Sequence, residues 1–183
     1  MSTLIGFTAK AGSGKDTCAL ILKEKLEDVE IFSFAQPLKE ACRLLFGFSD
    51  EQLYDPKIKE QVDSTWGKSP RQIFQWLGTD ILRDHIDKNF FVKLMTKRIQ
   101  NSTKKFVIIP DVRFDNEAAL VKELGGIVIK IERPNAETTI HSEHATEQGI
   151  NQFDELIIND GSLEVLVEKL SKSVSSFILV NSF

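Results

Sequence analysis

The sequence has little cysteine: Cys18 and Cys42 are the only two among its 183 residues. Their spacing matches no metal-binding motif and argues against a disulfide framework, which favours a reducing compartment. The chain also lacks any apolar run near the ~18 residues of a membrane-spanning helix. Residues 1–3 contain no basic segment of the kind that begins a secretory signal. We therefore expect a cytoplasmic protein that does not span a membrane.

Positive charge is scarce as well, with 23 Lys and Arg against 27 Asp and Glu and a net charge of −4. Coating a nucleic-acid polymer requires clustered cations, so this balance excludes that class of partner. It does not exclude a small anionic ligand, which responds to local charge. Residues 1–133 carry a net charge of +2, whereas residues 134–183 carry −6. Any cationic site should therefore lie within residues 1–133.

Apolar runs alternate with helical patterns along the chain. The runs that predict buried strands are residues 4–7, 31–34, 106–109, 127–131 and 156–158. Helices are expected over 37–46 with Gly47 as the cap, from Ser69 and Pro70 with a break or a kink at Gly78, over about 80–99 and 116–124, and from about 162. Apolar strands that alternate with helices predict an α/β fold, a parallel sheet with helices on both faces. The length fits a single domain, residues 1–183.

A glycine-rich segment follows the first expected strand, reading Ala-Lys-Ala-Gly-Ser-Gly-Lys-Asp-Thr over residues 9–17. A Walker A loop needs small residues that let backbone N–H groups surround phosphate oxygens, a lysine that reaches the phosphates, and a following helix. Gly12, Gly14 and Lys15 meet these needs. The alternative is a glycine-rich turn without a ligand, but the order of strand, turn, lysine and helix favours the phosphate loop.

Two positions depart from the common Walker A pattern. Ala9 stands at the first glycine, and Asp16 follows the lysine, so the hydroxyl is displaced to Thr17. This spacing resembles that of nucleoside monophosphate kinases.

The expected strand 106–109 leads through Pro110 to Asp111. An apolar strand that ends in aspartate resembles Walker B, where the carboxylate orients Mg²⁺ directly or through water. The alternative is an aspartate that caps the next turn. Taken alone the motif leaves both open, and the phosphate loop favours the metal.

Arg71, Gln75, Thr79 and Arg83 recur every four residues and would share one face of a helix. They suit a site for a phosphate and a base, since arginine binds phosphate bidentately and glutamine both donates and accepts. The alternative is a solvated helix face. Arg113 follows Asp111 at a strand end, where open α/β sheets bind ligands, unless it pairs with a local carboxylate such as Glu117.

Together these segments resemble the bacteriophage-type deoxynucleoside monophosphate kinase family. The resemblance runs in order from about residue 4 to residue 170, and each motif is modest while the ordered set is specific. It rests on Gly-Lys-Asp-Thr (14–17), Phe-Ala-Gln-Pro-Leu-Lys-Glu (34–40), the segment 70–83, Asp-Val-Arg-Phe (111–114) with Asn116 and Glu117, His-Ala-Thr-Glu (144–147) and Asn-Asp-Gly-Ser (159–162).

The resemblance implies a P-loop kinase fold with a helical monophosphate-binding region over about 36–100 and a short lid over about 133–152. It implies ATP- and Mg²⁺-dependent transfer of the γ-phosphate to a deoxynucleoside monophosphate (dNMP), so the partners are small nucleotides. It assigns ATP binding to Lys10, Gly12, Ser13, Gly14, Lys15, Asp16 and Thr17; the metal to Thr17 and Asp111; the acceptor to Lys39, Arg71, Gln75, Thr79, Arg83 and Arg113; and charge neutralisation to Lys15, Arg113 and Arg133.

The chain departs from the family in two places. Gln36 stands where the family often has aspartate, and residues 134–149 contain no Lys or Arg, so Arg133 at the hinge would have to serve. His141, Glu143, His144 and Glu147 fit no familiar zinc motif and are expected to close over a nucleotide.

Other interpretations stay open at this stage. A P-loop kinase could act on another small acceptor, such as dephospho-coenzyme A or a phosphorylated metabolite. A nucleotide-binding switch without transferase activity is the second alternative, although such switches commonly have Ser or Thr directly after the loop lysine. The apolar tail 177–180 fits the core or a homodimer interface, and the core is favoured. If the source is a virus, the compartment would be the host cytoplasm.

Overall fold

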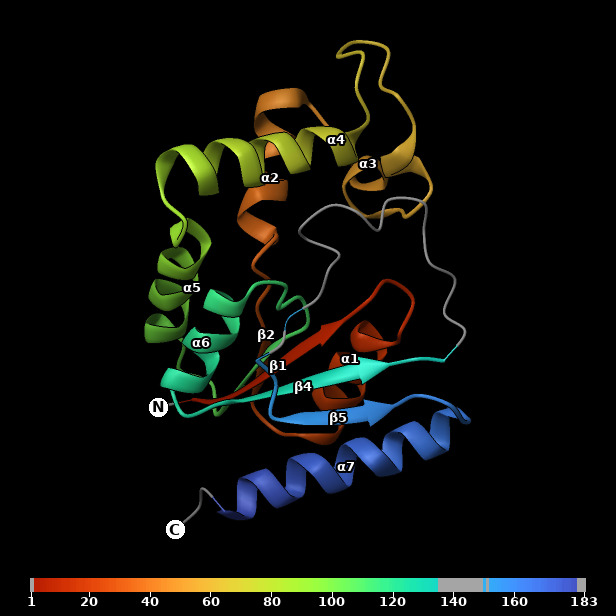
Figure 1. Ribbon diagram of the computed structural model, residues 1–183, viewed down its shortest axis with the longest axis vertical. Helices are drawn as coiled ribbons and strands as arrows, with labels where there is room; N and C mark the ends of the chain where they lie inside the picture. Colours follow the sequence, from red (N-terminus) through yellow and green to blue (C-terminus); the bar gives the residue numbers. More distant parts are fainter. Residues whose placement is uncertain (1, 135–149, 151, 181–183) are drawn as a thin grey trace. The chain divides into compact units, whose positions relative to one another are not determined.

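The computed structural model describes residues 2–134, 150 and 152–180, and the chain forms two compact units (Figure 1). Unit 1 comprises Met1–Ser33 and Met95–Phe183, and unit 2 comprises Phe34–Leu94. Unit 2 overlaps the segment of about 36–100 in which the family resemblance implies a helical monophosphate-binding region.

Unit 1 contains a parallel sheet of five strands in the order β2-β3-β1-β4-β5. The strands are β1 (Thr3–Ala9), β2 (Val29–Ile31), β3 (Phe106–Ile109), β4 (Ile127–Glu132) and β5 (Glu155–Ile158). The predicted parallel sheet is confirmed. The second strand is the one that was misplaced, since it spans Val29–Ile31 and not 31–34. Ser33 lies beyond the strand, and its hydroxyl donates to the carboxylate of Asp111.

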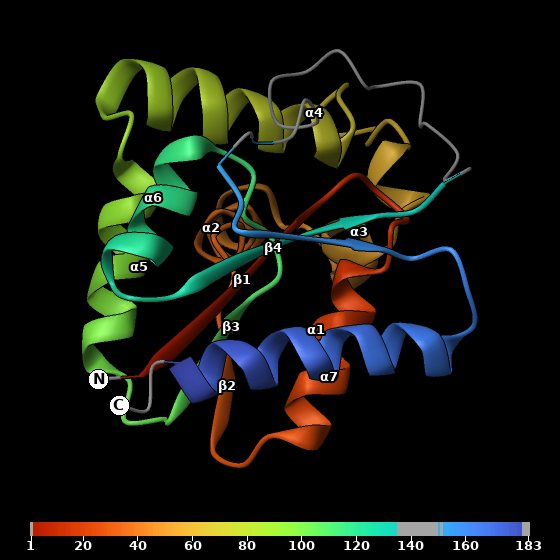
Figure 2. The same ribbon diagram turned by 60° about the horizontal axis from the view of Figure 1, so that its bottom comes forward.

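Helices cover both faces of this sheet, as the sequence predicts. On one face lie α1 (Lys15–Lys25) and α7 (Leu163–Val180) (Figure 2). Ile5 and Phe7 of β1 share a core cluster with buried residues of both helices. On the other face, a Cβ added to Gly6 would lie 3.5 Å from Val121 of α6 (Asp115–Glu123). Burial of each such apolar side chain stabilises the fold by about 1.5–3 kcal/mol.

The apolar end of α7 contributes to this core. Phe177 and Ile178 pack against the same cluster, as the core interpretation of the tail predicts, whereas Leu179 is exposed. Among the described residues, no helix combines the length and apolar character needed to cross a membrane.

Unit 2 is helical and has its own small core of Cys42, Phe48, Leu53 and Ile73. Its helices are α2 (Gln36–Phe46), α3 (Asp50–Tyr54), the 3-10 turn η1 (Ile58–Glu60), α4 (Pro70–Gln75), the π-helical segment η2 (Trp76–Ile86) and the beginning of α5 (Phe90–Asn101). Gly47 ends α2 with a φ of 69°, as predicted.

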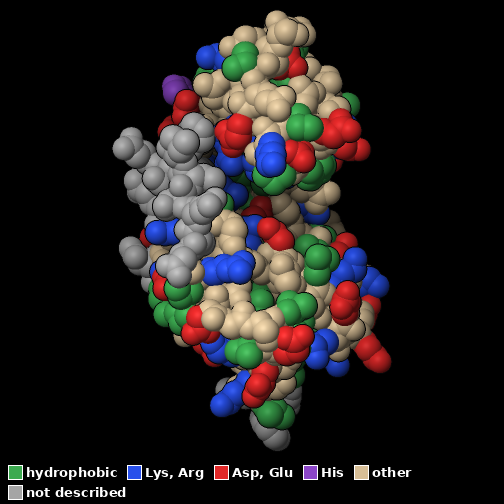
Figure 3. Space-filling model, turned by 90° about the vertical axis from the view of Figure 1, so that its right-hand side faces the viewer, with side chains coloured by type: hydrophobic (Ala, Val, Ile, Leu, Met, Phe, Trp, Pro, Cys, Tyr) green, Lys and Arg blue, Asp and Glu red, His purple; other side chains and the backbone are tan. Residues whose placement is uncertain are grey.

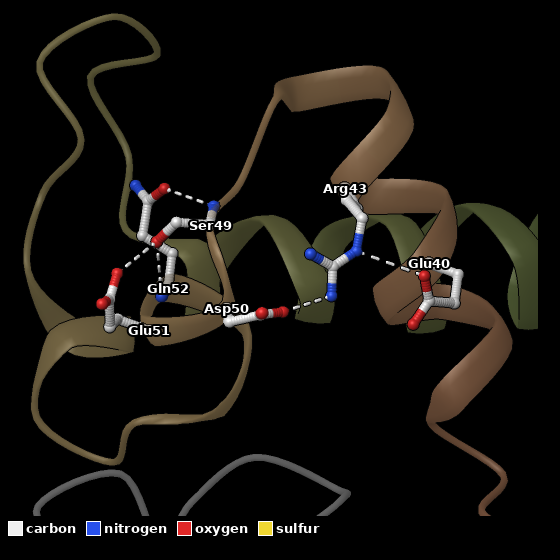
Figure 4. Close-up of polar contacts among 6 residues, drawn as sticks. All are labelled: Glu40, Arg43, Ser49, Asp50, Glu51 and Gln52. Atoms are coloured by element: carbon white, nitrogen blue, oxygen red, sulfur yellow. Dashed lines mark hydrogen bonds and ion pairs between the residues drawn. The ribbon is translucent and has the colours of Figure 1, made fainter.

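Capping boxes start the two middle helices of unit 2. Ser49 caps α3 and Ser69 caps α4, each with a glutamine three residues on that bonds back to the serine N–H. Figure 4 shows the first box, beside the ion pairs of Arg43 with Glu40 and Asp50. The predicted start at Ser69 and Pro70 is therefore confirmed.

Two helix predictions need correction. The helix does not break at Gly78, because η2 carries it on to Ile86, so of the two effects predicted for this glycine, a break or a kink, the break was wrong. A Cβ on Gly78 would lie 2.6 Å from Leu38 of α2, so glycine permits close helix packing there. The predicted helix 80–99 is interrupted because Asp87 is extended, and its carboxylate accepts the N–H of Asn89.

Candidate active site

The phosphate loop joins β1 to α1 and depends on two glycines with positive φ. Gly12 has a φ of 75° and Gly14 a φ of 100°, a region that other residues rarely adopt. The N–H of Ser13 donates to the carbonyl of Lys10 at 3.3 Å, which closes the turn. Because the N-cap Gly14 has no side chain, it offers the first N–H groups of α1 no side-chain cap. Such a helix end suits an anion.

Lys15 is the first residue of α1, and its ammonium group lies 2.8 and 2.7 Å from the two carboxylate oxygens of Asp16. The lysine side chain is 17% exposed and that of Asp16 75%, so the pair lies at the surface. Exposed ion pairs contribute only about 0–1 kcal/mol, so a phosphate can displace this carboxylate. Thr17, on the first turn of α1, is exposed.

Asp111 follows β3, the strand next to β1, and is 9% exposed. The hydroxyl of Ser33 donates to its carboxylate at 2.6 Å. The described residues contain no group of three or more His, Cys, Asp and Glu that could hold a metal. Mg²⁺ usually takes one or two carboxylates, with phosphate oxygens and water completing the shell. The carboxylate of Asp111 and the hydroxyl of Thr17 fit that mode, and both belong to elements that leave the carboxyl ends of adjacent strands.

Arg113 is positioned through its backbone. The carboxylate of Glu117, a side chain 1% exposed, accepts the N–H of Arg113 at 2.8 Å and that of Phe114 at 3.3 Å. Glu117, considered from the sequence as a partner of the Arg113 side chain, thus accepts hydrogen bonds from the backbone at Arg113 and Phe114. Arg133 directly follows β4 and is exposed. The predicted lid lies largely outside the described residues, as do His141, Glu143, His144 and Glu147.

In unit 2, the stripe predicted to bind the acceptor lies on one continuous helical segment, with Arg71 and Gln75 on α4 and Thr79 and Arg83 on η2. Arg71 forms an ion pair with Glu60 of η1 at 2.9 Å. Arg83 is buried, and its guanidinium lies 4.8 Å from the centre of the Phe91 ring.

Lys39 lies on α2 with its ammonium group 4.2 Å from the centre of the Tyr54 ring. Gln36 begins the same helix and is exposed. The roles of Lys39 and of the four-residue stripe in binding the acceptor stay predictions from the sequence.

Neither cysteine is suited to nucleophilic chemistry. Burial raises the pKa of the Cys18 thiol to about 11, and it does the same for Cys42. A thiol with such a pKa is protonated at neutral pH and unreactive. On the face shown in Figure 3, Lys and Arg side chains are interspersed with Asp and Glu.

Two residues that support this site, Ser33 and Asn159, had no individual role predicted from the sequence, and a third, Glu117, was considered only as a side-chain partner of Arg113. Asn159, just after β5, donates from its side-chain amide to the carbonyl of Ser13 at 3.0 Å. Ser33 contacts Asp111, and Glu117 holds the backbone at Arg113. Asn159 and Glu117 belong to motifs that carry the family resemblance, which was the only available signal for Asn159.

The parallel sheet and its phosphate loop place the chain in the P-loop kinase fold. Dephospho-CoA kinase from Campylobacter jejuni aligns with a TM-score of 0.54 at 16% identity, over 99% of this chain and 100% of that one. This similarity shows the fold alone. The more specific assignment comes from sequence: a family model, deoxynucleotide monophosphate kinase, matches residues 52–170. The chain belongs to this family.

Two relatives support the assignment. A protein of Acanthamoeba polyphaga mimivirus is 38% identical over an alignment of 192 positions, which spans 97% of this chain and 99% of the relative. The deoxynucleotide monophosphate kinase of Enterobacteria phage T4 is 34% identical over 122 residues, 64% of this chain and 49% of that protein. The predicted family is thus confirmed, and the kinase interpretation is favoured over a nucleotide-binding switch.

Proposed function

We propose that this kinase transfers the γ-phosphate of ATP to the phosphate of a dNMP, giving ADP and the deoxynucleoside diphosphate. The observation that carries the proposal is the phosphate loop, with its two left-handed glycines and Lys15 at the start of α1, in a chain of this family. We further propose that the reaction takes place in the cytoplasm, that of a host cell if the source is a virus.

The donor site is proposed to lie in unit 1. Loop N–H groups between Lys10 and Thr17 bind the phosphates, and Lys15 exchanges Asp16 for a phosphate oxygen. Thr17 and Asp111 would hold Mg²⁺, Asp111 either directly or through water. When bound, the ion offsets charge on the phosphate oxygens.

The acceptor-binding groups are proposed to be Lys39, Arg71, Gln75, Thr79, Arg83 and Arg113. Arg71 and Arg83 bind the monophosphate, since a guanidinium pairs bidentately with two phosphate oxygens. The amide of Gln75 can both donate to and accept from a base edge. Lys39 and Thr79 complete this proposed set.

The reaction needs little from side chains beyond position and charge. An oxygen of the acceptor phosphate attacks the γ-phosphorus, and the bond from that phosphorus to the β–γ bridging oxygen breaks. ADP leaves with the bonding electron pair. The attacking phosphate is already ionised at neutral pH, so a strong general base is unnecessary. Lys15, Arg113 and Arg133 are proposed to neutralise the transferring group.

An ADP-release assay tests the function across dNMPs, ribonucleoside monophosphates, dephospho-coenzyme A and a blank without acceptor. We expect release with dNMPs, while release confined to non-nucleotide acceptors would refute the substrate class. Lys15→Ala should lose about 10²–10³ in rate, as when a preorganised electrostatic group is deleted. Lys23→Ala, an exposed lysine on the same helix, is the matched control. Near-normal activity of Lys15→Ala would contradict the proposal.

The acceptor assignment is tested separately with Arg71→Ala. Loss of a phosphate ligand should raise the KM for the dNMP and leave the KM for ATP near its wild-type value. An effect confined to ATP would refute the placement of Arg71.

A further inference from the structure

Asn159 links the end of β5 to the middle of the phosphate loop, 146 residues away in sequence. Its side-chain nitrogen donates to the carbonyl of Ser13 at 3.0 Å. A Cβ added to Gly14 would lie 2.8 Å from the same nitrogen, so the amide packs directly against both residues. A carbonyl oxygen only accepts hydrogen bonds, so the amide must present its NH₂ group and not its oxygen.

The backbone that carries this amide is fixed on both sides. The N–H of Asn159 donates to the carbonyl of Glu132, at the end of β4, at 2.7 Å. The ammonium group of Lys169 on α7 bonds the carbonyl of Ile158 at 2.8 Å and the carboxylate of Asp160 at 2.7 Å. The backbone that carries the amide is therefore anchored to the sheet and to α7.

This contact controls the direction of one peptide group in the loop. The carbonyl of Ser13 and the N–H of Gly14 belong to the same planar trans peptide, so they point to opposite sides. Holding the carbonyl toward Asn159 turns the Gly14 N–H away from Asn159. That N–H lies at the N-cap of α1, where an anion is favoured by the helix dipole.

We propose that Asn159 is a positioning residue for the donor phosphates, because its amide sets the orientation of the Ser13–Gly14 peptide. The inference rests on the proposed function of the loop. It does not require Asn159 to touch ATP. Binding should depend on Asn159 for any ligand that uses the loop, whether or not the ligand carries a nucleoside.

The test compares Asn159→Ala and Asn159→Asp with the wild-type chain by calorimetric titration of ATP and of inorganic triphosphate in one magnesium buffer. Removal of a single hydrogen bond should raise the Kd of both ligands by about three- to tenfold. Asn159→Asp should raise both further, since a carboxylate cannot donate and repels the Ser13 carbonyl and the phosphates. In kinetics, the KM for ATP should rise while that for the dNMP stays unchanged. Asn101→Ala, an exposed asparagine at the end of α5, is the matched control.

Three outcomes would overturn the inference. Unchanged Kd values with a lowered Tm would give Asn159 a purely structural role. Weaker binding of ATP but not of triphosphate would mean that Asn159 contacts the nucleoside. If the wild-type chain binds no triphosphate, the phosphate-loop assignment itself fails, which separates failure of the proposed function from failure of this inference.

Discussion

Replacement of Glu117 tests how the structure holds Arg113. Glu117 lies in the first turn of α6 and is buried, and its carboxylate reaches back to the N–H groups of Arg113 and Phe114. Phe114 is the N-cap residue and has no polar side chain to offer, so Glu117 supplies the cap from within the helix. Glu117→Ala removes the acceptor for two N–H groups at once.

The expected loss follows from these two bonds. Leaving a buried donor without a partner costs about 1–3 kcal/mol, and bonds to charged acceptors lie at the upper end. Removing the buried charge offsets part of this cost, so we expect Glu117→Ala to lower the free energy of unfolding by about 3 kcal/mol. In a chain of this length 1 kcal/mol shifts Tm by about 2–4 °C, which gives a fall of about 6–12 °C. Glu117→Gln keeps an acceptor oxygen and should lose about 1 kcal/mol.

Thermal unfolding followed by circular dichroism measures these losses. Glu123→Ala, an exposed glutamate at the end of the same helix, should change the free energy of unfolding by no more than about 0.5 kcal/mol. The kcat of Glu117→Ala, measured well below its Tm, should also fall because the backbone at Arg113 is released. A Tm within about 2 °C of wild type would refute the energetic argument, and an unchanged kcat would refute the link to Arg113.

Two further predictions concern stability. Gly126→Ala should destabilise by about 3 kcal/mol in chemical denaturation, because its Cβ would lie 2.6 Å from the Cβ and 2.8 Å from the carbonyl of Leu4. Gly125→Ala meets nothing within 4 Å and pays only for its φ of 75°, about 1 kcal/mol, so equal losses would contradict the packing argument. The hydrogen bond from Lys169 lowers the pKa of Asp160 below its ordinary 3.8. The small stabilisation from this hydrogen bond should be fully present above pH 3.8 and should be lost as pH falls through the folded-state pKa of Asp160. A Tm difference between the wild-type chain and Asp160→Asn that persists at pH 2 would refute this.

The fold could be predicted from the sequence wherever the signal is local. Buried parallel strands such as residues 106–109 are apolar at every position, and Gly47 and Ser69 are residue types that helix ends require. Asp87 gives no such signal, because it interrupts a helix through a bond that its side chain makes two residues on. A break at Gly78 was wrongly predicted because this glycine permits the close approach of Leu38, a tertiary contact that leaves no local signal.

The candidate site divides in the same way. The loop from Lys10 to Thr17 is contiguous, so its chemistry is visible in the sequence. The residues that support the site are distant from it in sequence. Asn159 lies 146 residues from Ser13 of the loop, and Ser33 lies 78 residues from Asp111. A single asparagine or serine has many possible roles, and only the fold selects one.

The structure also explains why the loop tolerates its two departures from the Walker A pattern. Ala9 is the last residue of β1, paired in register with Ile131, so its backbone is extended and a Cβ is accepted. Positive φ occurs at Gly12 and Gly14, where glycine is retained. Asp16 lies in the first turn of α1, where the helix dipole favours a negative charge. The loop therefore needs glycine at positions 12 and 14, where φ is positive, and accepts alanine at position 9, where the backbone is extended.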